Sequence, residues 1–390
     1  MCTIIFFLSP VLAVPFILSE IKRRRQYAVI LFCLFLGVIA YCTIPTQDLF
    51  RHFAHYEHYS TYNFTDFEWK DFELNGIIVY LYCLMGKLSI PFDILRLFTV
   101  SIGFYLLYDV FQFKIKKNGY IYSNKDWFYR FLILFFFFDL FYTISGVRYG
   151  FALTLYIYGA FCYIEKKSYL ISLIYVLLAC LYHPSFIFLS IVTYSIYLIR
   201  ISPRKMLIYT IFAYLIMSFW MSKYGYLLGV RQDWYLKGGG VTSYSNMTIN
   251  GLIGFFLPKF FGLCFAIPLI KNFNNKSKWM RLALAWMLIS LISLNNAVFF
   301  YRFWWGFMAL GIYTFIDREQ MYGVIPREFK LTLIASLCFF LTSLIPAHGK
   351  LMKSEYSRII EPIPLIFSKY YTTDYVLKLY PDAGDFTSNL

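Results

Sequence analysis

The chain has 390 residues, of which 60% are hydrophobic, 23% aromatic and only 15% charged. About a quarter of the residues of a soluble globular domain are charged, so this composition excludes a single water-soluble core. The net charge of +15 is distributed over short segments between apolar runs, which indicates membrane topology and argues against a nucleic-acid partner.

The apolar runs predict an all-α, polytopic membrane bundle of about twelve helices, because about 20 apolar residues span a bilayer as a helix. The first run, residues 2–18, has the length of a signal peptide, but its positive cluster follows it at residues 22–25. We therefore expect a retained helix. The predicted helices cover residues 2–19, 27–44, 92–113, 128–145, 149–164, 168–182, 184–200, 206–222, 251–270, 282–299, 302–316 and 330–346.

Residues 76–90 form a shorter apolar run. Such a run is typical of a re-entrant or interface-lying helix, although an ordinary short span remains an alternative. With the N-terminus outside, positive residues concentrate in the inner loops, as the orientation rule requires. The outer loops carry Arg51, Lys70, Lys87, Arg148, Lys223, Arg231, Lys237 and Arg302. We expect one membrane domain, residues 1–346, with large outer loops at 45–91 and 223–250, and an extracytoplasmic tail of low order at 347–390.

Four arginines stand alone at predicted outer helix ends: Arg51, Arg148, Arg231 and Arg302. A guanidinium near hydrocarbon costs about 2.5–3.5 kcal/mol on insertion scales, so it persists where it faces a polar cavity or a ligand. Its planar fork fits phosphate oxygens. Snorkelling to lipid headgroups explains any one of them, such as Arg148 in ISGVRYG, but four together favour a shared anionic ligand.

The segment LYHPSF places His183 at a predicted outer turn, with Pro184 beginning the next helix. Histidine titrates near neutral pH and can accept a proton from a hydroxyl group in a transition state. A purely structural histidine is the alternative. One predicted helix runs inward after Arg148 and the next runs back outward to His183, so both residues can face one outer cavity.

Residues 46–62 alternate polar and aromatic side chains. The polar residues recur at three- and four-residue steps: Asp48, Arg51, His52, His55 and Glu57. On a helix they share one side, while the aromatic residues are expected to meet the bilayer: Phe50, Phe53 and Tyr56. This helix either lies solvated at the interface or binds substrate. The spacing of His52, His55 and His58 places them at different angles around the helix axis, so we expect no metal site.

Arg302 lies among aromatic residues in NNAVFFYRFWWGF. Trp304 and Trp305 belong either to an aromatic belt or to a surface that stacks on sugar rings and holds the arginine. The glycines at 238–240, beside Arg231, match no phosphate-binding loop and indicate a hinge.

With these motifs, the chain resembles the bacterial polysaccharide polymerases of the EpsG-like and Wzy-type O-antigen polymerase class. The likeness covers most of the chain and is specific at three points: the polar segment 48–59, the Gly-Val-Arg-Tyr element around Arg148, and the His-Pro-Ser element at 183–185. The family often has Arg-Gln where this chain has Arg148-Tyr149. It also has a Glu-Pro-Gly-Tyr-like element where this chain has Leu-Asn-Gly-Ile at 74–77.

The resemblance implies a metal-independent, cofactor-free glycosyltransferase at the periplasmic face of the bacterial inner membrane. It would join oligosaccharide units carried on undecaprenyl pyrophosphate into O-antigen or a related surface polysaccharide, with a chain-length regulator protein as a further partner. We expect Arg148 and His183 to be catalytic. The expected substrate-binding residues are Arg51, Arg231, Arg302, Asp48, Glu57 and Tyr149.

Two other functions fit the same pattern. An O-antigen ligase shares the lipid-linked donor but transfers the finished chain to the lipid A core. A flippase or transporter of the lipid-linked oligosaccharide needs charged residues deep within its spans. Such residues are few here: Arg96, Asp109, Asp139 and Lys259.

Overall fold

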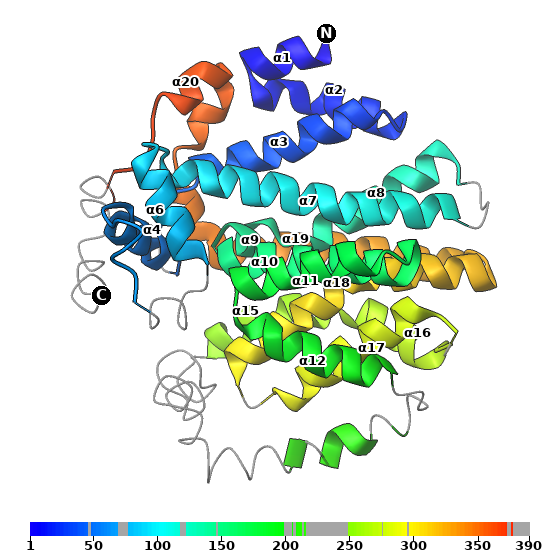
Figure 1. Ribbon diagram of the computed structural model, residues 1–390. Helices are drawn as coiled ribbons and strands as arrows, with labels where there is room; N and C mark the ends of the chain where they lie inside the picture. The colour runs from blue at the N-terminus through cyan, green and yellow to red at the C-terminus, as the bar shows by residue number, and fades with distance from the viewer. Residues whose placement is uncertain are drawn as a thin grey trace.

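The structure is a computed structural model that describes residues 1–45, 48–68, 77–117, 122–145, 147–198, 205, 208–212, 214–215, 249–274, 276–294, 296–372 and 376. Within these residues every regular element is a helix, so the predicted all-α class is confirmed. The long helices lie side by side in alternating directions, and their connections gather at two ends of the molecule (Figure 1).

The N-terminal layer consists of α1 (Cys2–Leu8), α2 (Pro10–Lys22) and α3 (Gln26–Cys42). The single helix predicted over residues 2–19 is broken at Ser9, which is extended (φ −163°, ψ 104°). Proline begins helices well because its missing N–H is not needed there, and Pro10 accordingly starts α2. Helix α3 packs along α7 (Phe92–Lys116).

The predicted helix over residues 128–145 is also broken, into α8 (Asn124–Phe137) and α9 (Leu140–Ser145). The break lies at Asp139, whose φ of 49° is in the left-handed region that helices of L-residues avoid. Helix α10 (Val147–Phe161) follows and ends in a π-helical turn, η2 (Cys162–Lys166). Helices α9 and α10 pack against each other where the chain turns back.

Helices α11 (Tyr169–Tyr182) and α12 (Ser185–Leu198) form a hairpin through His183 and Pro184. Most of the predicted span 206–222 lies outside the described residues. The span predicted at 251–270 consists of α15 (Ile249–Phe260) and α16 (Leu263–Lys271), and its two parts bend by 45° at residues 261–262.

Helices α17 (Lys278–Ile292) and α18 (Ala297–Tyr322) are joined by a turn that falls earlier than predicted. The Asn296 side chain accepts a hydrogen bond from the Phe299 amide over 3.0 Å and so fixes the start of α18. Arg302 therefore lies in the second turn of α18 and not at a helix junction. Helix α19 (Pro326–Lys353) runs without a break through residues 346 and 347, the expected domain boundary.

Two short helices lie together beside the beginning of α7: α4 (Asp48–Ser60) and α6 (Ile78–Lys87). The aromatic residues of α4 were expected to meet the bilayer, and this prediction is wrong. Phe50 and Phe53 are each 2% exposed, and the Phe53 ring packs edge-on against Phe92 at 5.8 Å. Packing inside the protein buries these rings more completely than an interface would.

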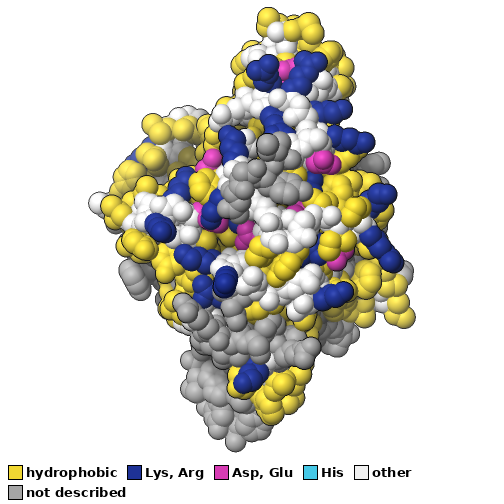
Figure 2. All heavy atoms as spheres, turned by 90° about the vertical axis from the view of Figure 1, so that its right-hand side faces the viewer, with side chains coloured by type: hydrophobic (Ala, Val, Ile, Leu, Met, Phe, Trp, Pro, Cys, Tyr) yellow, Lys and Arg dark blue, Asp and Glu magenta, His cyan; other side chains and the backbone are white. Residues whose placement is uncertain are grey.

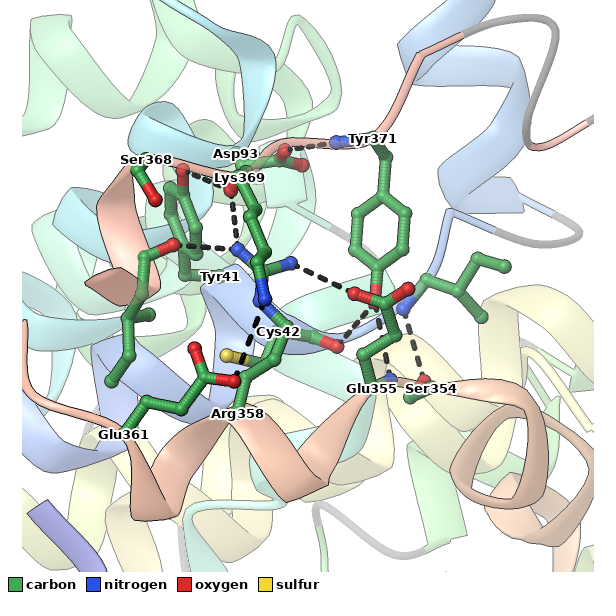
Figure 3. A network of polar contacts seen from close by, with 12 residues as sticks. Tyr41, Cys42, Asp93, Ser354, Glu355, Arg358, Glu361, Ser368, Lys369 and Tyr371 are labelled. Atoms are coloured by element: carbon green, nitrogen blue, oxygen red, sulfur yellow. Dashed lines mark hydrogen bonds and ion pairs between the residues drawn. The ribbon is translucent and has the colours of Figure 1, made fainter. Parts of the chain in front are cut away.

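The tail was predicted to have low order, but its described part is folded. It contains the 3-10 turn η6 (Tyr356–Ile360) and α20 (Ile363–Phe367). Figure 3 shows how it is fastened: Arg358 donates to the Ile366 carbonyl at 2.5 Å, and the Tyr371 hydroxyl donates to the Cys42 carbonyl at 2.7 Å. The Tyr371 amide also donates to Asp93 Oδ2 at 3.0 Å. This network ties the tail to α3 and α7.

By length and composition, α7 alone among the described helices could cross a membrane by itself, and the bent pair α15 and α16 passes the same test when taken together. Shorter apolar helices include α3, α6, α11 and α12. The number of spans stays a prediction.

Candidate active site

The two ends of the bundle differ in charge. Helices α7 and α18 end, and α8, α17 and α19 begin, at the same end, which we call the cationic end. Figure 2 shows this end covered with Lys and Arg side chains among hydrophobic ones. Its exposed cations include Lys116, Lys117, Lys125, Lys166, Lys167, Lys276 and Arg327. The same loops were predicted to lie inside.

Buried ion pairs hold the cationic end together. Lys114 of α7 pairs with Asp317 of α18 and lies 3.3 Å from Glu165, which also accepts a hydrogen bond from Trp279 at 2.7 Å. Arg130 of α8 donates two hydrogen bonds to Glu319 of α18, at 2.5 and 2.7 Å. These contacts fix which helix ends lie here, so α10 and α18 must begin at the opposite end.

At that opposite end, α10 and α18 bring three of the predicted site residues together. The Tyr149 hydroxyl donates to the Arg302 carbonyl at 3.0 Å, and the Arg302 guanidinium lies over the Tyr149 ring, 5.4 Å from its centroid. The Tyr149 ring meets the His183 ring edge-on at 5.4 Å. Tyr149 thus bridges the arginine of α18 to the histidine between α11 and α12.

Helix α4 adds a second histidine to this end. His52 is buried, with 3% of its surface exposed. Burial lowers the pKa of His52 well below its usual value, and the positive charges of Arg148, Arg51, His55 and Arg302 lower it further. The charges of three of the four predicted outer arginines thus oppose protonation of this buried imidazole.

The hydrogen bonds of His183 determine which of its ring nitrogens carries the proton. The Ser185 backbone amide donates to Nδ1 of His183 at 3.3 Å, and the Ser185 hydroxyl lies 2.8 Å from the same nitrogen. A backbone amide can only donate, so Nδ1 carries a lone pair and the neutral ring holds its proton on Nε2. This contact forms at the first turn of α12, because Pro184 leads the chain into that helix.

The remaining predicted site residues lie apart from this cluster or cannot be placed. Arg231 and the glycine segment 238–240 lie outside the described residues, as does nearly all of the loop 223–250. Asp48 is the first residue of α4, and its side chain is not among those that the structure describes. Glu57 is exposed on α4, away from the buried face that carries His52.

The histidines of α4 have different surroundings, as their spacing predicts. His52 is buried, whereas His58 is exposed and its Nε2 lies 2.8 Å from the Tyr62 hydroxyl. Across the described parts of the chain, no three His, Cys, Asp or Glu side chains are placed to hold a metal ion.

A second polar cluster, which sequence reasoning did not assign to the site, lies on another side of α18. The Tyr301 hydroxyl donates to Asp139 at 3.0 Å, and the Lys259 ammonium lies 4.1 Å from the centroid of the Tyr301 ring. Tyr142 and Trp305 connect this cluster to the Tyr149 ring through contacts of 4.6 and 6.0 Å. The only signal in the sequence was an isolated charge in each of two apolar runs.

Comparison of the chain with family models, with curated proteins and with solved structures gave no match.

Proposed function

We propose that the chain is an integral membrane glycosyltransferase that polymerises oligosaccharide units carried on undecaprenyl pyrophosphate into a surface polysaccharide. The observation that carries this proposal is the contact of Tyr149 with both Arg302 and His183, at the end of the bundle where α10 begins with Arg148 beside Tyr149. Guanidinium groups gathered in a site of low water content fit a ligand with more than one negative charge.

The chemistry of a glycosyl diphosphate suits this cluster. Its bond to the sugar breaks when the diphosphate departs with the electron pair, so the protein must stabilise growing negative charge and take a proton from the acceptor hydroxyl. Fixed arginines supply the first requirement without a metal. In mutational studies of comparable sites, removing one such donor costs about 10²–10³-fold in rate.

The surface of the bundle supports placement in a bilayer. Helix α11 exposes a series of large apolar side chains: Leu170, Ile171, Leu173, Ile174, Leu177, Leu178 and Leu181. Apolar surface of this extent on one helix is typical of contact with lipid or a partner, and α12 continues it with Ile187, Phe188 and Ile191. With the cationic end inside, the arginine cluster faces the periplasm.

The direct test is polysaccharide banding in a strain deleted for the gene and complemented with variants. Arg148→Ala should leave the protein in the membrane and shorten the surface polysaccharide to one repeat unit. Arg23→Ala is the matched control, because Arg23 is exposed at the cationic end, where its side chain pairs with Glu20. Full-length chains in the Arg148→Ala strain would remove Arg148 from the mechanism.

Orientation has its own test. In a cysteine-free background, a cysteine at exposed Thr65 should react with a membrane-impermeant thiol reagent added to intact spheroplasts. A cysteine at exposed Lys125 should react only after permeabilisation. Labelling of both from outside contradicts the proposed topology.

A second candidate function, translocation of the lipid-linked oligosaccharide, is favoured by the cluster of Asp139, Tyr301 and Lys259. Asp139 lies at the break between α8 and α9, and Lys259 lies just before the bend between α15 and α16. Interrupted helices with ionisable residues are typical of transporter binding sites. Asp139→Asn separates the two functions, because a transporter defect abolishes all surface sugar whereas a polymerase defect leaves single repeats.

A further inference from the structure

We propose that Lys259 binds the phosphate of the lipid carrier, and that the apolar chain of this lipid lies along the exposed face of α15. The inference rests on the proposed function for the identity of the lipid, a polyprenyl diphosphate. In the sequence Lys259 is only one of the few charges within apolar runs. The structure gives it surroundings that suit an anionic head group.

The Lys259 side chain is buried without a carboxylate in contact with it. Only 7% of the residue is exposed, and its ammonium lies over two rings, 4.1 Å from the centroids of Phe255 and Tyr301. Among the residues that the structure describes, no carboxylate forms an ion pair with this ammonium and no oxygen accepts a hydrogen bond from it. Aromatic faces attract the cation but leave its N–H groups without an acceptor.

Asp139 is the carboxylate of this cluster, and other donors use its oxygens. Oδ2 accepts from the Tyr301 hydroxyl at 3.0 Å, and Oδ1 accepts from the Tyr142 backbone amide at 3.3 Å. Asp139 therefore holds the ring over which the Lys259 ammonium lies. The donors of that ammonium stay available for a phosphate oxygen.

The backbone at Lys259 is fixed against α18. The Trp304 indole donates to the Lys259 carbonyl at 2.9 Å. A Cβ atom at Gly262 would lie 2.7 Å from Trp304 Nε1 and 3.0 Å from Met308 Sδ, so the junction of α15 and α16 packs directly on α18. A site held in place before the ligand arrives loses less entropy on binding.

The exposed face of α15 next to Lys259 is apolar. Its large side chains recur at steps of three and four residues: Ile249, Ile253, Phe256 and Phe260. Residues three apart on a helix are neighbours, so Lys259 lies beside Phe256, at the border between this stripe and the face turned toward α18. A lysine near hydrocarbon is costly and persists where it meets a polar cavity or a ligand. A lipid with an anionic head group supplies both the chain and the charge that this border lacks.

The Lys259 site is continuous with the candidate active site. The Tyr142 ring lies 4.4 Å from the Tyr301 ring and 4.6 Å from the Trp305 ring, and Trp305 lies 6.0 Å from Tyr149. Packed rings thus connect the lysine to the tyrosine that contacts the arginine and histidine of that site. This continuity favours the carrier lipid, whose sugar is the proposed substrate, over a phospholipid of the bilayer.

Binding of undecaprenyl diphosphate to the full-length protein, purified in a neutral detergent, tests the site. Lys259→Met keeps an apolar stem but removes the ammonium, so the lipid should bind about 10–100-fold more weakly, the usual loss for a hydrogen bond to a charged group. Lys259→Arg keeps a cation and should bind within about tenfold of the wild type. Lys271→Met is the matched control, because Lys271 is exposed in the last turn of α16, and its affinity should equal that of the wild type.

Thermal unfolding separates a binding residue from a structural one. A lysine near hydrocarbon costs more on insertion scales than a cation–π contact usually returns. Without lipid, Lys259→Met should therefore unfold at the temperature of the wild type or above it. Undecaprenyl diphosphate should raise the unfolding temperature of the wild type but not of Lys259→Met. A lower unfolding temperature of the lipid-free variant, together with unchanged affinity, would assign the lysine to packing alone and overturn the proposal.

Two further ligands identify the lipid. Dioleoyl phosphatidylglycerol and inorganic pyrophosphate should each bind the wild-type protein more weakly than undecaprenyl diphosphate does. Phosphatidylglycerol bound as tightly would assign the site to a membrane phospholipid. Pyrophosphate bound as tightly would exclude a contribution from the apolar face of α15. Either result overturns the assignment to the carrier lipid.

Chain extension distinguishes this inference from the function on which it rests. If wild-type membranes do not extend lipid-linked repeat units but the affinity for undecaprenyl diphosphate depends on Lys259, the proposed function fails and the lipid site stands. If Lys259→Met extends chains with an unchanged KM for the lipid-linked unit, the inference fails and the proposed function stands.

Discussion

The Tyr149 hydroxyl donates a hydrogen bond to the Arg302 carbonyl oxygen, and the guanidinium of Arg302 lies over the ring of the same tyrosine. The two residues are 153 positions apart in the sequence, on α10 and α18. This contact fixes the height of Arg302 along the bundle relative to Arg148, which precedes Tyr149 on α10. The proposed diphosphate clamp depends on it.

Two substitutions separate the hydrogen bond of the Tyr149 hydroxyl from the contact that its ring makes with Arg302. Tyr149→Phe removes the hydrogen bond but keeps the ring, so the free energy of unfolding should fall by about 0.5–1.5 kcal/mol with little change in polysaccharide length. Tyr149→Leu also removes the ring beneath the guanidinium and should shorten the chains. Thermal unfolding in detergent and banding of the polysaccharide measure the two effects. Equal chain lengths in both variants would show that the ring does not position Arg302.

Arg302 should be sensitive to the shape of the side chain as well as to its charge. Arg302→Lys keeps the positive charge but not the planar fork that holds two phosphate oxygens, so chain extension should be reduced. Arg302→Gln should reduce the rate by about 10²–10³-fold. The extension rate in membranes checks this order, and a lysine variant as active as wild type would indicate that charge alone is sufficient.

The contact between α4 and α6 offers a test that leaves the site residues unchanged. A Cβ atom at Gly86 would lie 2.3 Å from the Ser60 carbonyl oxygen and 2.6 Å from the Ser60 Cα, which is backbone that cannot move aside easily. Gly86→Ala should therefore displace α4, with its His52, and lower polymerisation.

Gly254→Ala is the matched control, because the same atom at Gly254 meets nothing within 4 Å. The readout is chain extension per amount of protein in the membrane. An unaffected Gly86→Ala enzyme would mean that α4 need not keep this position.

The ion pair of Arg130 and Glu319 should matter for stability and not for chemistry. Removing one partner, as in Glu319→Leu, leaves a buried charge uncompensated and should cost about 3–5 kcal/mol. The double variant Arg130→Met with Glu319→Leu should recover much of this loss. Thermal unfolding checks the prediction, and a double variant less stable than either single one contradicts it.

His52 predicts a dependence of stability on pH. Its pKa is lowered in the folded protein, first by burial and then by the neighbouring positive charges. The unfolded chain therefore binds a proton more readily, so stability is full above the ordinary histidine pKa of about 6.5 and falls as the pH decreases below it. The loss between pH 7 and pH 5 should be smaller in His52→Gln than in the wild type. Parallel curves for the two proteins would show that His52 is not held neutral.

Local properties of the sequence were sufficient to predict the helical class and the difference in charge between the two ends of the bundle. Apolar composition and helix length are properties of neighbouring residues, and alternation of loop charge follows directly from chain order. The same reasoning identified Arg51, Arg148, His183 and Arg302, because an isolated cation beside an apolar run is visible without a structure. Chain order alone also placed Arg148 and His183 at the same end of the bundle.

Only the tertiary structure decided what surrounds these residues. The aromatic residues of α4 face inward because α6 and α7 cover them, and this same packing buries His52. The tautomer of His183 is set by an amide two residues away whose direction depends on the start of α12. The break at Asp139 is likewise matched by contacts from a distant helix, through Tyr301. Burial and hydrogen-bond direction arise from segments far apart in the chain, so neither can be read from periodicity.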